Sequence, residues 1–326
     1  MPRKHISSTI SLRVSVLGVA LCVWFSSASA GQGKRPVPPP KNTQRFFASA
    51  DAAAKALLAA AETDDQAALL LLFGPAGKEV LSSGDPSQDR NYRAAFVGKA
   101  RVSLKLVKDP TNENRVIIAI GEDDFPFAIP LVQAADKRWH FDMEEGKFEV
   151  LARRIGSNEL DAIAVCSGYV EAQKEYASED HSQNNVRKYA HKLISSPGKR
   201  DGLYWPDSPD APASPISAGI AKAAQGDTKS GDMPTPYHGY YFKILTSQGA
   251  NAAGGARDYL QHGLMMGGFG LIAWPAEYGV SGIQTFTVNQ DGVIFQKDLG
   301  PHTGIAAHAI TRFDPDKTWR ILRVLE

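Results

Sequence analysis

Pairs of residues whose spacing would let them bind a metal ion or transfer a proton together occur at few places in this sequence of 326 residues. Asp258 and His262 stand four positions apart and would share one face of a helix. His140 and Asp142 would share one face of a strand, as an acid–base pair requires. The sequence contains neither His-x-x-x-His nor His-Glu-x-x-His. We therefore favour solvated or buried histidines, and we predict no metal site and no cofactor.

Motifs for a nucleophile are incomplete as well. Ser281 follows Gly279 but lacks the Gly-x-Ser-x-Gly spacing of a nucleophile elbow. The segment 314–318, Asp-Pro-Asp-Lys-Thr, imitates a phosphatase motif, but only eight residues follow it, so a hairpin turn is the better interpretation. Cys166 lies in an apolar stretch, which predicts a buried side chain. We predict no catalytic residue, and we lean towards a protein that is not an enzyme.

The densest group of residues suited to binding is aromatic. Tyr and Trp each supply a large contact area and one polar group, which suits a binding surface or a glycan groove. The predicted binding residues are Tyr204, Trp205, Tyr237, His238, Tyr240, Trp274 and Tyr278. The same residues would also serve as the core and rim of a sheet, and the sequence leaves both interpretations open.

Residues 1–30 have the features of a cleavable signal peptide. Three Lys or Arg residues without an acid precede an apolar run at 14–25, and an Ala-Ser-Ala exit at 28–30 suits signal peptidase. A helix of twelve residues reaches about 18 Å, which is short of the roughly 30 Å of a membrane core. Cys22 would anchor a lipoprotein, but the bulky residue before it fits that motif poorly. We therefore expect a periplasmic or extracellular protein with no transmembrane segment after cleavage.

The charge balance excludes one class of partner. Of 36 Lys and Arg residues, three belong to the signal segment, which leaves 33 against 35 Asp and Glu. Nucleic-acid-binding proteins usually carry a basic excess or a basic stripe. We therefore predict no nucleic-acid partner, and we keep an envelope protein or a glycan as the partners to consider.

Helix signals precede strand signals in the first part of the mature chain, which follows a Pro-rich leader at 31–45 that we expect to be disordered. Capping residues predict helices that begin at 49–51, at 63–66 and at Asp89. Alternating apolar residues predict strands at 101–107, 115–120, 125–132 and 137–143. Helices followed by an antiparallel meander predict an α+β domain over 46–152.

A second α+β domain is expected over 153–326. A long helix at 148–176, interrupted near 156–158, leads into it, and a shorter helix is expected at 184–194. Seven of the 20 prolines lie within 197–236, so we expect an irregular excursion there, with a short helix at 216–224. Strands are expected at 240–245, 268–274, 282–288, 293–297, 307–313 and 319–324, with a hairpin turn at 289–292.

Several strings of residues resemble one known family. They are 158–162 (Asn-Glu-Leu-Asp-Ala), 202–206, 237–245, 254–256, 273–282, 285–288 and 297–300. Together they resemble the bacterial domain-of-unknown-function 2950 (DUF2950) family over essentially the whole mature chain. The resemblance implies an exported, envelope-associated protein and brings no established activity with it.

Two resemblances concern the folds of the two domains. The element order of 46–152 resembles the nuclear transport factor 2-like cone, in which a curved sheet wraps around helices and many members bind small molecules or catalyse in the cone mouth. The second domain resembles the globular head of type IV pilins and pseudopilins, where a helix packs across an antiparallel sheet. The apolar helix that polymerises pilins has no counterpart here, because the first domain takes its position.

The sequence therefore predicts an exported, soluble, non-catalytic binding or assembly protein of the cell envelope. The alternative is a small-molecule-binding protein or an enzyme that uses the cone of the first domain.

Overall fold

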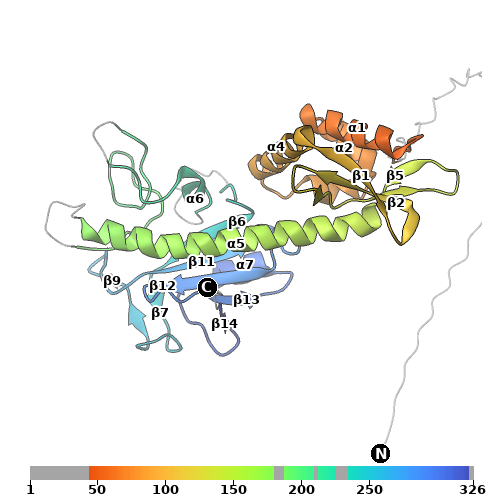
Figure 1. The fold of residues 1–326 in the computed structure, drawn as a ribbon. Coiled ribbons are helices and arrows are strands. Elements are labelled where there is room, and N and C mark those ends of the chain that lie inside the picture. The colour runs from red at the N-terminus through yellow and green to blue at the C-terminus, as the bar shows by residue number, and fades with distance from the viewer. Residues whose placement is uncertain (1–43, 180–186, 209–211, 225–233, 323–326) are drawn as a thin grey trace, which may run out of the picture. The chain divides into compact units, whose positions relative to one another are not determined.

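The computed structural model describes residues 44–179, 187–208, 212–224 and 234–322. The expected signal peptide and nearly all of the expected Pro-rich leader lie outside the described residues. The described chain is a mixed α+β fold with two larger antiparallel sheets (Figure 1). This confirms the predicted fold class at that level, whereas the cone and the pilin head remain expectations.

Four helices open the described chain, and their starts follow from side-chain caps. They are α1 (Ala50–Glu62), α2 (Gln66–Phe73), α3 (Gly77–Leu81) and α4 (Pro86–Val102). Ser49 accepts a hydrogen bond from the backbone of Ala52, and Asp65 accepts one from Ala68. The helix expected from Asp89 begins three residues earlier, because Asp85 caps it and a proline occupies its first position.

The first sheet consists of five antiparallel strands. They are β1 (Leu104–Asp109), β2 (Asn112–Ile120), β3 (Phe125–Pro126), β4 (Leu131–Gln133) and β5 (Trp139–Phe141). Their order is β1-β2-β4-β5, with β3 also paired to β2. The helices pack on this sheet through buried residues such as Leu57, Leu69, Ile118 and Phe141. The meander is confirmed, but the strand expected at 125–132 is divided into two short strands.

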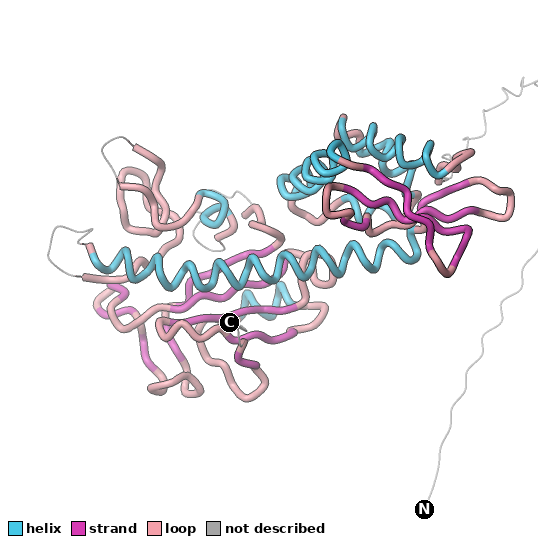
Figure 2. Tube along the Cα trace, in the orientation of Figure 1, coloured by secondary structure: helices cyan, strands magenta, loops and turns pink. Residues whose placement is uncertain are grey.

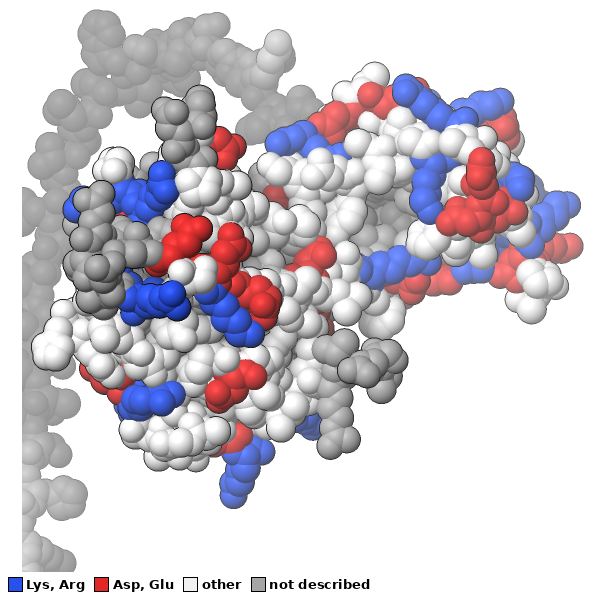
Figure 3. All heavy atoms as spheres, turned by 60° about the vertical axis from the view of Figure 1, so that its left-hand side comes forward, with Lys and Arg blue, Asp and Glu red and all other residues white. Residues whose placement is uncertain are grey.

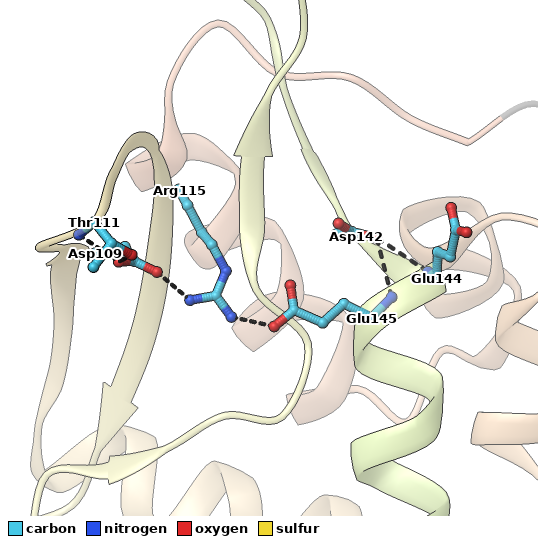
Figure 4. A network of polar contacts seen from close by, with 6 residues as sticks. All are labelled: Asp109, Thr111, Arg115, Asp142, Glu144 and Glu145. Atoms are coloured by element: carbon cyan, nitrogen blue, oxygen red, sulfur yellow. Dashed lines mark hydrogen bonds and ion pairs between the residues drawn. The ribbon is translucent and has the colours of Figure 1, made fainter.

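A polar network fixes the β1–β2 hairpin to the start of the next helix (Figure 4). Arg115 donates to the carboxylates of Asp109 and Glu145. Asp109 also accepts from the backbone N–H of Thr111 at 2.8 Å and from its hydroxyl at 2.7 Å. Asp142 caps the helix by accepting hydrogen bonds from the backbone N–H groups of Glu144 and Glu145. The hairpin and the helix start are therefore held by charge-assisted hydrogen bonds.

The helix α5 (Met143–Ser178) runs without a break for 36 residues. The interruption expected at 156–158 is wrong. Gly156 and Ser157 are exposed on the helix surface, and Asn158 is buried and bonds to other elements instead of capping a new helix. The expected domain boundary between residues 152 and 153 lies inside this helix.

The second sheet lies between two helices (Figures 1 and 2). Its strands are β6 (Tyr240–Leu245), β11 (Gly270–Pro275), β12 (Gln284–Asn289), β13 (Phe295–Asp298) and β14 (Arg320–Ile321), in the order β14-β13-β12-β11-β6. On β11, Leu271 and Ala273 belong to the core shared with α5, while Ile272 and Trp274 belong to the core shared with α7 (Thr303–Ala309). Successive side chains on a strand point to opposite faces, so β11 is buried on both.

Shorter elements complete the second half. They are α6 (Ala218–Lys222), the pair β7 (Ser247–Gln248) and β8 (Arg257–Asp258), and the pair β9 (Leu260–Gln261) and β10 (Leu264–Met265). The strand expected at 307–313 is wrong, because 303–309 is helical. The helix expected at 184–194 is also wrong for 187–194, where Tyr189 and Ile194 form isolated β-bridges; its first three residues lie outside the described chain.

The surface carries both signs of charge. Lys and Arg as well as Asp and Glu occur on the face drawn in Figure 3. Ion pairs in the described chain include Lys99–Asp123 and Arg101–Glu62. None of the helices in the described ranges is long and apolar enough to cross a membrane.

Candidate functional site

A tight turn presents His238 at the start of β6. Tyr237 and Tyr240 exchange backbone hydrogen bonds of 2.9 and 3.1 Å across it. His238 and Gly239, the two residues of the turn, have φ angles of 47° and 73°. Two successive positive φ angles identify a type I′ turn, which suits the twist of a β-hairpin. A Cβ atom at residue 239 would lie 2.5 Å from Nδ2 of Asn158, so the close approach of the turn to α5 requires glycine.

The His238 ring is held from two sides. Its Nδ1 lies 2.7 Å from Oδ2 of Asp161 on α5, and the Tyr237 ring stacks on it with centroids 4.1 Å apart. The His238 and Asp161 side chains are 38% and 40% exposed. The carboxylate therefore orients the imidazole, and each group keeps a second polar atom with which it can bond to a ligand.

A cavity of about 290 Å³ opens beside this pair. Its apolar wall comes from α5, from α6 and its flank, and from the second sheet. The lining residues are Asp161, Ala164, Val165, Gly168, Tyr169, Leu193, Pro215, Ile216, Ser217, Ile220, Tyr237, His238, Phe242 and Leu271. We call it the α5–α6 cavity. Apolar walls with a few polar groups at one side are typical of ligand-binding sites.

The predicted binding residues divide into three groups. Tyr237 and His238 line the α5–α6 cavity. Trp205, Tyr240 and Trp274 are buried in the cores, so they can only support the walls of a site. Two of the predicted residues lie elsewhere: Tyr204 is half-buried and pairs with Ile194, and Tyr278 donates to Asp298.

Three of the strings noted in the sequence meet beside this cavity. Asn158 accepts a hydrogen bond from Gln88 at 2.9 Å and donates one to the carbonyl of Ser281 at 2.8 Å. Glu159 accepts from two successive backbone N–H groups at 283 and 284, each at 2.9 Å. Together with Asp161, they join the string 158–162 to the turn at 237–240 and to the loop at 277–283. One segment of α5 therefore positions both loops.

Comparison with known families identifies one that matches most of the chain. The profile of the family described as "Protein of unknown function (DUF2950)" matches residues 44–322. The chain belongs to the DUF2950 family. Neither the search of curated proteins nor the search of solved structures gave a match.

The candidate nucleophiles of this DUF2950 protein are held in structural roles. Ser281 is buried, and its hydroxyl donates to the carbonyl of Glu277 and accepts from the backbone N–H of the same residue. Asp314 accepts two hydrogen bonds from Asn251, at 2.9 and 3.0 Å. Cys166 is buried as predicted, and burial raises the pKa of its thiol to about 12. All three side chains therefore have contacts or burial that support the fold.

The histidine–acid pairs of the sequence are not brought together either. The segment of Asp258 and His262 forms β8, β9 and a turn, so the shared helix face considered for them is wrong. Asp142 caps α5, whereas the His140 ring packs against Phe46 with centroids 4.7 Å apart. Within the described ranges, no group of three or more His, Cys, Asp or Glu residues is arranged to hold a metal ion.

Sequence reasoning missed Asp161 as a site residue. It appeared only as the fourth residue of the string 158–162, and its histidine partner lies 77 positions further along the chain. The useful signal was the spacing on α5. Asn158, Asp161, Val165 and Gly168 recur at three or four positions and therefore share one helix face, which is the face turned to the cavity and the loops.

Proposed function

We propose that this DUF2950 protein is an exported, non-catalytic binding protein of the cell envelope. In this proposal the α5–α6 cavity receives one apolar side chain of a partner protein. The observation that carries the proposal is the Asp161–His238 pair, 2.7 Å apart, at the side of a cavity whose walls are otherwise mainly apolar.

The size of the cavity favours a single inserted group. Sites for complete drug-sized ligands usually measure about 300–1,000 Å³. A cavity of about 290 Å³ lies at the lower limit of that range and is suited to one aliphatic or aromatic side chain. Binding energy at protein interfaces concentrates in a few such anchors that fill pockets. A glycan, which needs exposed aromatic faces, fits less well because Trp205 and Trp274 are buried.

The polar pair would set the orientation of the partner. The second oxygen of Asp161 can accept a hydrogen bond from a partner N–H, and the second ring nitrogen of His238 can bond to a carbonyl or a hydroxyl. The Asp161 and His238 side chains are more than a third exposed, so they can reach a partner without a movement of the backbone. Insertion of the partner's apolar side chain would contribute most of the affinity, and hydrogen bonds to Asp161 and His238 would fix the partner's orientation.

Two features support the exported and non-catalytic parts of the proposal. Residues 1–30 have the basic start, apolar run and small-residue exit of a signal peptide. Ser281, Asp314 and Cys166 each serve the fold through burial or hydrogen bonds, which leaves them poorly placed as nucleophiles.

Gly168 allows a direct test of the cavity. A Cβ atom at this position meets no atom within 4 Å, and the residue lies on α5 and lines the cavity. Gly168→Leu therefore fills the cavity and raises helix propensity, which favours folding by about 0.5–1 kcal/mol. Gly156→Leu is the matched control, because it is an open position of the same helix that does not line the cavity.

The experiment compares what the wild type and the two variants retain from an envelope extract, with mass spectrometry as the readout. We expect a partner that wild type and Gly156→Leu retain equally and that Gly168→Leu loses by on the order of tenfold or more. Equal retention of every protein by all three would contradict the proposal.

A further inference from the structure

A second cavity lies in the first half of the chain. It measures about 410 Å³ and is bounded by α3, α4, β3 and the N-terminal part of α5. Its lining residues are Val80, Leu81, Asp89, Tyr92, Arg93, Phe125, Ala128, Val150, Arg153, Arg154 and Ser157. We call it the α3–α5 cavity. It shares no lining residue with the α5–α6 cavity, so the two can be tested separately.

Arg154 is the unusual residue of this wall. It is only 7% exposed, although arginine is rarely buried without a charged partner. Its guanidinium donates to the backbone carbonyls of Glu79 and Val80, near the end of α3. These two bonds use two of its five N–H donors. In the described ranges, no carboxylate forms an ion pair with Arg154.

The neighbouring charges already have partners of their own. Arg93 forms an ion pair with Asp64, and Arg153 forms one with Glu149. Asp89 is the acid of the cavity wall, and both of its oxygens accept from the backbone N–H of Ser83, at 3.1 and 3.2 Å. Its charge also lies in the first turn of α4, where backbone N–H groups stabilise an anion.

A buried guanidinium that forms no ion pair is costly. Burial lowers the pKa of Arg154, because the low-dielectric surroundings oppose its charge, and the nearby Asp89, Tyr92 and Glu277 offset only part of that effect. Buried charges in proteins are usually paired, and neutral carbonyls compensate less than an anion does. The wall of the α3–α5 cavity therefore offers a preformed site for one negative charge.

The cavity also has an apolar part, which includes Val80, Leu81 and Val150 and extends towards the core. A smaller cavity of about 150 Å³ shares Val80, Leu81, Tyr92, Arg93 and Val150 with it. This extension is lined further by Leu57, Ala61, Leu69, Phe73, Phe96, Phe127 and Ile129. A ligand that placed an anionic group at Arg154 could lay an apolar body along Val80 and Val150.

We propose that the α3–α5 cavity binds a small amphipathic carboxylate, with Arg154 bonded to the carboxylate group and the apolar body lying between α3, α4 and α5. This inference is independent of the proposed partner-binding cavity. It assigns a ligand class to a part of the chain that the partner-binding proposal does not use.

The test uses three probes that share one apolar chain and differ in charge. Octanoate, octanol and octylamine are titrated into the protein, and binding is followed by calorimetry. We expect one saturable site for octanoate, with an affinity at least about tenfold above that for octanol, because a carboxylate adds charge-assisted hydrogen bonds. Octylamine should bind more weakly than octanol, since its charge would face Arg154. Equal affinities for octanoate and octanol, or no saturable octanoate site, would overturn the proposal.

Two variants locate the site. Arg154→Met should reduce octanoate affinity by on the order of tenfold or more and leave octanol affinity within about twofold. If Arg154 serves only to bond the end of α3, the substitution alters the melting temperature and leaves the ratio of the two affinities unchanged, which would also overturn the proposal.

The second variant covers the case in which Arg154→Met fails to fold. Ser157 is exposed on α5 and lines the cavity, so Ser157→Phe should block octanoate binding. Ser167→Phe, at another exposed position of α5 that lines neither cavity, is the matched control and should leave binding unchanged. Gly168→Leu should leave it unchanged as well. Loss of octanoate binding in Gly168→Leu but not in Ser157→Phe would place the ligand in the α5–α6 cavity and overturn the assignment.

Discussion

The Oδ2 atom of Asp161 lies 2.7 Å from Nδ1 of His238, and this contact joins α5 to the turn before β6. Three residues earlier, Asn158 joins the same helix to Ser281. The two contacts differ in surroundings, because Asn158 is fully buried and the Asp161–His238 pair is more than a third exposed. Their contributions to stability should therefore differ, although the residues lie on one face of one helix.

Asn158→Ala should destabilise the protein by about 2–3 kcal/mol, because the buried carbonyl of Ser281 and the amide of Gln88 would lose their partner. Asp161→Asn should cost less than about 1 kcal/mol, since a polar contact that is more than a third exposed is screened by water. Urea unfolding curves of the two variants and the wild type provide the measurement. A larger loss from Asp161→Asn than from Asn158→Ala would show that the ranking is wrong.

The turn at 238–239 makes a prediction about glycine. Gly239→Ala would combine a left-handed backbone, at φ 73°, with a contact of 2.5 Å to Asn158. Gly279→Ala is the control, because its φ is 76° and its Cβ would meet no atom within 4 Å. The left-handed backbone alone costs roughly 1–2 kcal/mol. Gly239→Ala should cost clearly more than Gly279→Ala in thermal unfolding, and equal losses would refute the close approach.

Cys166 should be unreactive in the folded protein. Burial raises its pKa to about 12, so far less of the protein carries the reactive thiolate at pH 8.5 than an ordinary thiol would, for which the fraction is about half. In protein that lacks residues 1–30, a chromogenic disulfide reagent should titrate one thiol in denaturant and react at least about a hundredfold more slowly without it. Rapid reaction of the folded protein would contradict the buried position.

The Asp109 network predicts a dependence of stability on acid pH. Hydrogen bonds from Thr111 and Arg115 lower the pKa of Asp109 to about 2, against about 3.9 in an unfolded chain. A pKa that is lower in the folded state stabilises the fold above pH 4, and this contribution is lost as the pH falls towards 2. Asp109→Asn should therefore lower stability at pH 6, and its difference from wild type should shrink between pH 4 and pH 2.5.

Urea midpoints of both proteins at pH 6, 4, 3 and 2.5 measure that difference. Asp136→Asn is a suitable control, because Asp136 also has a lowered pKa through its bond to Arg138 but lies outside the hairpin network. A constant difference between wild type and Asp109→Asn over the whole range would mean that the carboxylate does not contribute through its charge.

Four strands of the second sheet were predictable from the sequence, whereas the short strands β7 to β10 were not predicted. Alternation and β-branched residues located β6, β11, β12 and β13 to within two residues of their bounds. The strand expected at 307–313 was wrong because 307–309 form the end of α7, whose alanines suit a helix. Ala307 and Phe313 are both buried, so their apolar character alone did not distinguish a strand from a helix.

The sites were less predictable than the strands. Gly156, Ser157 and Asn158 read as a helix break, but Asn158 finds its partners on α4 and in the loop at 277–283, which no local pattern reveals. Arg154 was missed, although Val150, Arg154 and Asn158 recur every four residues along α5 and so share a face. A charged residue on the buried face of a helix was the available signal.

The most direct measurement of the central claim is a photo-crosslink from inside the α5–α6 cavity. A small diazirine-bearing amino acid replaces Ala164, which lines the cavity, or Ser167, which is exposed on the same helix and does not line it. Irradiation of the native envelope should give one discrete crosslinked partner from position 164 that is absent when Gly168→Leu is added, and no such product from position 167. The same products from both positions, or none from position 164, would contradict a partner anchored in this cavity.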